Sequence, residues 1–178
     1  PASDAERALL GPQSGVREDV MAGTYTPPRA DGSGRDRVQL RRALDLLAQA
    51  GWTLRNGHLE NAEGRSLGFE IMVTTREQER LCLAFASQMA RAGIDARVRM
   101  VDPVQFDARR GSYDFDMVPF IWTQSLSPGN EQAFYFGSQA AATPGTRNYM
   151  GIRSPAADAA IDALKQAVTQ AELATATR

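Results

Sequence analysis

The region between residues 67 and 121 alternates between strand-like and helix-like patterns, and this order constrains the fold more than any other feature. Three segments are typical of hydrophobic strands, and two segments between them fit helices. In chain order these segments are 67–74, 77–92, 95–101, 103–110 and 114–121. Because crossovers between parallel strands are right-handed, the order β-α-β-α-β predicts an α/β fold with a largely parallel sheet covered by crossover helices.

Local signals agree with these elements. Thr75 and Gln78 have the spacing of a capping box at the start of the helix over 77–92, whose Leu81, Phe85 and Met89 are predicted to face the core. Pro119 gives no ladder hydrogen bond, so we expect the third strand to change partner or leave the sheet there.

The rest of the chain suggests three regions. Residues 1–36 are predicted to be mostly irregular, with one short helix capped by Ser3. Residues 37–168 are expected to form the α/β ligand-binding lobe. It would begin with a helix over 37–50, followed by a hairpin turning at Asn56-Gly57, and end with a helix capped by Ser154. The tail 169–178 has no predicted partner within the chain, and we expect it to fray.

Composition excludes several classes of function. The chain has 178 residues and a formal net charge of −1, without the basic patch that nucleic-acid binding needs. No apolar run approaches the length of a membrane-spanning helix. With one cysteine, Cys82, and one histidine, His58, neither a disulfide nor a cysteine-based zinc site is expected. We predict no catalytic residues, no metal and no cofactor. The opening Pro1, without an initiator methionine or export signal, suggests a piece of a longer protein.

The polar stretch 122–132 is the strongest candidate site. It follows the third predicted strand, and ligands of open α/β sheets bind beyond the carboxyl ends of strands. It gathers an aromatic ring and neutral hydrogen-bonding groups, which suit binding without chemistry. The candidate ligand-binding residues are Trp122, Gln124, Ser125, Asn130, Arg147 and Asn148. The alternatives are a polar loop with Trp122 in the core, and helix-entry packing for 147–149. Asp114 and Asp116 share a strand face and could do acid/base work, although a solvated strand entrance explains them better.

Several segments, read in order, resemble the oligopeptide-type solute-binding proteins (family 5) of ABC importers. They are 43–52, 67–71, 92–96, 111–117, 147–152 and 154–158. The resemblance covers nearly all of residues 35–168 and implies the second lobe of a type II periplasmic-binding-protein-like fold. Within the family, the stretch Trp122–Gln132 is most similar to the branch of microcin C-type peptide binders.

The resemblance implies a non-catalytic protein of the periplasm that closes on a peptide or peptide-like small solute and delivers it to an ABC permease in the membrane. Dipeptide and oligopeptide binders of this family commonly carry an aspartate just after the strand-end tryptophan. Thr123, Gln124 and Ser125 stand in that region here. A blocked or modified peptide, or another polar solute, therefore fits better than a simple dipeptide. The rival interpretations are an α/β hydrolase or transferase domain and a purely interactional domain.

Overall fold

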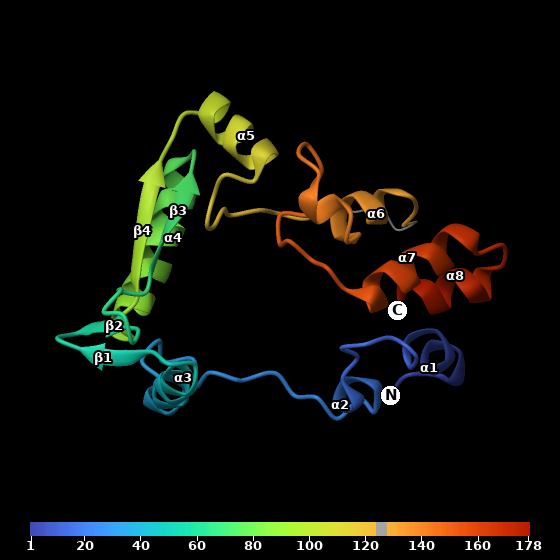
Figure 1. Ribbon diagram of the computed structural model, residues 1–178, viewed down its shortest axis with the longest axis horizontal. Helices are drawn as coiled ribbons and strands as arrows, with labels where there is room; N and C mark the ends of the chain where they lie inside the picture. Colours follow the sequence, from blue (N-terminus) through green and yellow to red (C-terminus); the bar gives the residue numbers. More distant parts are fainter. Residues whose placement is uncertain (124–127) are drawn as a thin grey trace. The chain divides into compact units, whose positions relative to one another are not determined.

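The computed structural model describes residues 1–123 and 128–178 (Figure 1). The chain forms two compact units. The sheet unit comprises residues 27–110 and 114–121. The helical unit comprises residues 1–26, 111–113 and 122–178.

A parallel strand pair forms the centre of the sheet unit. Strand β3 (Gly68–Val73) pairs with β4 (Asp95–Met100), and helix α4 (Arg76–Arg91) connects them (Figure 1). Ile71 lies opposite Val98 in this register. The capping box predicted from the sequence is present, because the Thr75 side chain accepts a hydrogen bond from the backbone of Gln78 and the Gln78 side chain reciprocates. The predicted α/β fold with a parallel sheet and a crossover helix is confirmed.

The third predicted strand, over 114–121, is reduced to one parallel bridge between Met117 and Ile71. The Met117 carbonyl accepts from the Met72 N–H at 3.0 Å, and the Met117 N–H donates to the Glu70 carbonyl at 3.2 Å. The next ladder position is taken by a side chain, because Asp116 Oδ2 accepts from the Glu70 N–H at 2.9 Å. On the other side Pro119 lacks a donor, so the ladder cannot extend. The expectation of a full third strand was wrong for these two reasons.

Helix α5 (Pro103–Ser112) contributes Phe106 to a small core beside the strand pair. Met72, Val101 and Phe106 form the buried cluster, and Phe115 and Val118 pack against it. These last two residues explain why the segment after α5 stays beside the sheet although it makes only one bridge. Apolar contact holds it where ladder hydrogen bonds do not.

Helix α4 presents a different side to its surroundings from the one predicted. Leu81 is 68% exposed and Phe85 is 40% exposed, whereas Cys82 and Ala86 are half-buried. The stripes 81-85-89 and 82-86-89 both have helical spacing and both contain Met89, which is half-buried. The sequence therefore could not separate them, and the choice of Leu81 and Phe85 as core residues was wrong.

A hairpin precedes the strand pair. Strands β1 (Thr53–Arg55) and β2 (His58–Glu60) are antiparallel, and Asn56 and Gly57 between them have φ values of 49° and 84°. These are the positive values that a two-residue type I′ turn requires, as the Asn-Gly pair predicted. Leu59 is buried, and its N–H donates to the Gly93 carbonyl at 2.8 Å. The hairpin is thereby attached to the turn between α4 and β4.

Helix α3 (Arg37–Gln49) stands before the hairpin, where a helix over 37–50 was predicted. The Asp36 side chain accepts from the N–H groups of Val38 and Gln39, so the helix begins at the expected cap. Leu40, Ala43, Leu44 and Leu47 have the spacing of an apolar stripe. The three leucines are half-buried, Ala43 is exposed, and no residue of the helix is fully buried.

The helical unit contains short helices, most of them capped. Its elements are α1 (Asp4–Leu10), α2 (Glu18–Met21), α6 (Glu131–Phe136), the 3-10 turn η1 (Ala140–Ala142), α7 (Pro155–Gln166) and α8 (Gln170–Thr177). The Ser3 and Ser154 caps are present as predicted. Residues 1–36 hold two helices where one was expected. Within the described residues, no helix has the length and hydropathy needed to cross a membrane.

The C-terminal segment is ordered, against the expectation that residues 169–178 would fray. Thr169 and Glu172 form a capping box that opens α8, a signal that the sequence interpretation missed. Helix α8 lies along α7 (Figure 1), so it has the partner that the sequence did not reveal. Val168 lies four positions after Leu164, a spacing that predicts an inward side chain, but it stands between the two helices and is 88% exposed.

Candidate functional site

Trp122 is the centre of an aromatic cluster in the helical unit. Its ring centroid lies 5.1 Å from that of Tyr135, 5.2 Å from that of Phe136 and 6.5 Å from that of Tyr149. These four residues define the aromatic cluster, and all of them are half-buried. Helix α6 supplies Tyr135 and Phe136. Half-buried residues keep part of their surface exposed to solvent. Aromatic residues supply large apolar contact area for stacking.

Arg147 supplies a positive charge on the loop that also carries Tyr149. Its backbone N–H donates to the Phe134 carbonyl at 3.2 Å, which attaches the loop to α6. Its side chain is exposed, and among residues 1–123 and 128–178 its guanidinium has no ion pair. Three other arginines of the helical unit are ion-paired, namely Arg7, Arg17 and Arg178. With respect to the described residues, the Arg147 guanidinium can therefore pair with an anionic group without first losing an ion-pair partner.

Asn148 is fully buried, and its side chain forms hydrogen bonds with backbone groups on and near its own loop. Its Nδ2 donates to the carbonyls of Gly137 and Ile152, at 3.0 and 2.8 Å, and its Oδ1 accepts from the Ile152 N–H at 2.9 Å. Both amide N–H bonds and one oxygen lone pair are thus satisfied by backbone. The geometry suits Asn148 to closing the turn over 148–152, between Arg147 and α7.

The stretch 122–132 is only partly described. The predicted residues Gln124 and Ser125 lie outside the described residues. Asn130 is exposed and stands before α6, where its side chain makes no capping hydrogen bond. Glu131 Oε1 accepts from the Gly129 N–H at 2.8 Å and from Gln132 Nε2 at 3.2 Å. These hydrogen bonds, that of Gly129 first, lower the pKa of Glu131, so it carries a full negative charge at neutral pH.

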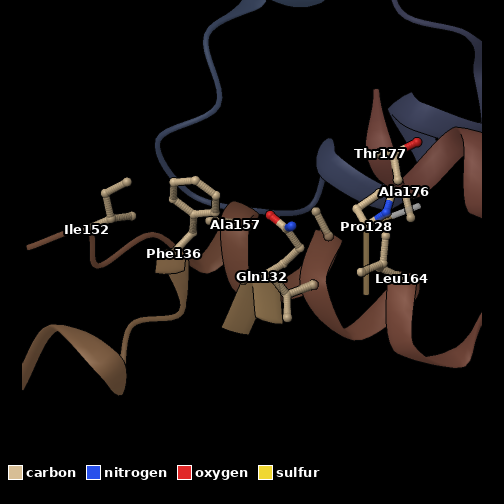
Figure 2. Close-up of a pocket in the computed structure, with 10 residues that line it drawn as sticks. Pro128, Gln132, Phe136, Ile152, Ala157, Leu164, Ala176 and Thr177 are labelled. Atoms are coloured by element: carbon tan, nitrogen blue, oxygen red, sulfur yellow. The ribbon is translucent and has the colours of Figure 1, made fainter. Parts of the chain in front are cut away.

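A separate apolar cavity of about 380 Å³ lies in the same unit, beside helices α6, α7 and α8. Phe136 and Ile152 lie toward one end of it, Ala176 and Thr177 toward the other, with Gln132 between (Figure 2). Other lining residues are Pro128, Ala157, Ala160, Ile161 and Leu164. Phe136 is therefore shared by the cavity and the aromatic cluster.

Among the described residues, none of the four predicted site residues Trp122, Asn130, Arg147 and Asn148 lines this cavity. The sequence does carry a signal for it, because Ala157, Ile161 and Leu164 form the apolar stripe of the last predicted helix. That stripe indicates a buried helix face, and nothing in its spacing distinguishes a face packed on other side chains from one that borders a hollow.

The two carboxylates considered for acid/base work have structural contacts in the sheet unit. Arg109 binds Asp114 at 3.1 Å and Glu70 at 3.0 Å, and Glu70 also binds Arg99 at 3.2 Å. Asp116 bonds to the sheet backbone as described above. The network ties α5, β3, β4 and the segment after α5 together. It explains these charged residues without a reaction.

The comparison with known families places this fold in a class of binding proteins. Residues 7–144 match the model "Bacterial extracellular solute-binding proteins, family 5 Middle". The chain therefore belongs to the bacterial extracellular solute-binding proteins of family 5.

Individual relatives and one solved structure place the chain further. It is 42% identical over its whole length to a putative binding protein of Brucella melitensis, of which it covers 29%. It is 39% identical over 99% of its length to the peptidoglycan-binding protein YepA of Agrobacterium fabrum, again covering 29%. The oligopeptide-binding protein AppA of Bacillus subtilis, solved with a nonapeptide, has a TM-score of 0.67 and 21% identity over 77% of this chain and 27% of that one. This likeness confirms the type II periplasmic-binding-protein-like fold. The chain spans less than a third of the length of these relatives.

Proposed function

We propose that this chain forms part of the ligand-binding region of a solute-binding protein that delivers peptides or peptide-like solutes to an ABC transporter in the membrane. The observation that carries the proposal is the aromatic cluster around Trp122, whose Tyr149 shares a loop with Arg147 and whose Tyr135 lies on the helix that this loop contacts. Arg147 has no ion pair among the described residues. Rings supply stacking surface, and the guanidinium supplies a forked donor that matches a carboxylate. Membership of a family of extracellular binding proteins supports the same function.

Within this proposal, the ligand contacts are Trp122, Gln124, Ser125, Asn130 and Arg147. Asn148 contributes by holding the loop between Arg147 and α7, because its amide groups are bonded to Gly137 and Ile152. The ligand binds by stacking and hydrogen bonds and is released unchanged. A family named for binding supports that reading over the hydrolase or transferase alternative.

The ligand we propose is a modified peptide that carries a carboxylate. Thr123, Gln124 and Ser125 stand in the region where peptide binders of the family commonly have an aspartate for the peptide amine, which argues against a plain dipeptide. The relative YepA is named for peptidoglycan, a polymer that contains modified peptides. The similarity of residues 122–132 to microcin C-type peptide binders supports a peptide-like solute. The proposed location is the periplasm, which the extracellular family supports.

Mass spectrometry of small molecules that co-purify with the protein expressed from its complete gene tests this proposal. We expect peptide-like molecules bearing a carboxylate, lost from an Arg147→Gln variant and retained by Arg153→Gln. Arg153 is also an exposed arginine of the helical unit and serves as the matched control. Molecules without any peptide bond, bound equally by the wild type and Arg147→Gln, would contradict the proposal.

A further inference from the structure

Tyr113 has a backbone conformation that bulky residues avoid. Its φ is 60°, in the left-handed region, which is sterically unfavourable for an L-residue with a side chain. Among the described residues, the only other non-glycine with positive φ is Asn56, in a hairpin turn that favours asparagine. Such strain persists where the surroundings impose it, and it occurs often at functional sites. The contacts of the Tyr113 side chain therefore need an explanation.

The phenol hydroxyl of Tyr113 holds the segment that leads to Arg147. It lies 2.5 Å from Thr146 Oγ1 and 3.2 Å from the Ala140 carbonyl oxygen. Thr146 Oγ1 in turn lies 2.7 Å from the Ala140 carbonyl and 2.8 Å from that of Thr143. One residue earlier, the Gly145 N–H donates to the Gly111 carbonyl at 2.7 Å. Residues 111–113 thus contact the loop at two successive positions.

The same residue also contacts the aromatic cluster. The Tyr113 ring meets that of Tyr149 edge to face, with centroids 6.2 Å apart, and Tyr149 lies beside Trp122. We infer that Tyr113 is a positioning residue of the ligand site. Through Thr146 it holds the loop 143–149, so that Tyr149 stays against Trp122 and the Arg147 backbone stays bonded to α6. That this contact serves a ligand site rests on the proposed function. The contact between Tyr113 and Thr146 can itself be tested without a ligand.

Fluorescence of Trp122 reports whether the contact between Tyr113 and Thr146 holds the aromatic cluster in place. The chain has two tryptophans, so a Trp52→Phe background leaves Trp122 as the single emitter. In that background we compare Tyr113→Phe and Thr146→Val, which each remove one hydroxyl, with Thr146→Ser, which keeps it. Acrylamide quenching should rise in the first two and stay at the reference value in Thr146→Ser. Because the two hydroxyls contact each other, the double variant should be quenched less than the sum of the single changes predicts.

A purely structural role would give a different pattern. Tyr113→Phe and Thr146→Val would then lower the thermal midpoint while Trp122 quenching stayed unchanged, and the inference would be overturned. Equal quenching changes in Thr146→Val and Thr146→Ser would overturn it as well. In the protein expressed from its complete gene, Tyr113→Phe should weaken binding of peptidoglycan fragments released by lysozyme by about fivefold, the usual loss for one hydrogen bond. If the unaltered protein fails to bind these fragments, the proposed function is wrong. The quenching result still decides whether Tyr113 positions the loop 143–149.

Discussion

Replacing Gly93 by alanine should destabilise the sheet unit by about 2–4 kcal/mol, the sum of a left-handed backbone penalty and a steric clash. Gly93 has a φ of 81°. A Cβ there would lie 2.5 Å from Leu54 Cδ1, 3.1 Å from the Leu59 nitrogen and 3.2 Å from the Gly57 oxygen. The Leu54 side chain can move aside. The backbone of the hairpin cannot, because the Leu59 N–H is bonded to the Gly93 carbonyl.

Urea unfolding, with Gly64→Ala as the matched control, measures this loss. Gly64 has a similar φ of 75°, but a Cβ there would have no atom within 4 Å. The control should therefore lose only the conformational part, about 1 kcal/mol. Equal losses for the two variants would mean that the hairpin does not pack on the turn at Gly93 as described.

Asn148→Asp should destabilise the helical unit by about 3 kcal/mol at neutral pH, since buried donors are lost and a charge is buried. The carboxylate would face the carbonyl oxygens of Gly137 and Ile152, to which the amide now donates. Repulsion and burial raise the pKa of the new carboxyl group in the folded state above its unfolded value. The destabilisation is therefore full above the folded pKa and diminishes as the pH falls toward the unfolded value, because the protonated acid is neutral and can donate one hydrogen bond.

Thermal unfolding between neutral and mildly acidic pH tests this expectation. Asn130→Asp is the matched control, because Asn130 is exposed and its side chain makes no capping hydrogen bond. Its midpoint should stay close to that of the wild type. If Asn148→Asp were as stable as the control at neutral pH, Asn148 would not be the buried loop residue that its contacts describe.

Local patterns predicted most of the elements, because caps, turns and periodicity act within a few residues. The Asn56-Gly57 turn and the Thr75 cap are of this kind. The prediction of a full third strand was wrong because the Asp116 side chain accepts the hydrogen bond of a ladder position from the Glu70 N–H. Asp116 is present in the sequence, but this role is visible only once its partner strand is placed. The prediction of the buried face of α4 was wrong because two apolar stripes share Met89, and only the tertiary packing selects one of them.

The site was harder to predict than the fold. A sequence shows that Trp122, Tyr135 and Tyr149 are aromatic, but their meeting depends on the placement of α6 and of the loop after it. Asparagine is a residue type that suits a ligand contact, and the hydrogen bonds of Asn148 to distant carbonyls could not be inferred from sequence spacing. Tyr113 gave no signal, because a left-handed backbone is predictable at glycine or asparagine and not at tyrosine.

The central claim is that the aromatic cluster binds the solute, and calorimetry on Trp122→Ala tests it most directly. The protein is expressed from its complete gene, and the probe is the peptidoglycan fragment mixture released by lysozyme. Thermal unfolding in parallel must show that the variant is folded, and Trp52→Ala, in the sheet unit, is the control. We expect Trp122→Ala to weaken binding by more than about 1 kcal/mol, the threshold for an important contact, and Trp52→Ala to leave it unchanged. Unchanged affinity in a folded Trp122→Ala protein, with Gln124→Ala and Asn130→Ala also silent, would contradict the account and place the binding site elsewhere.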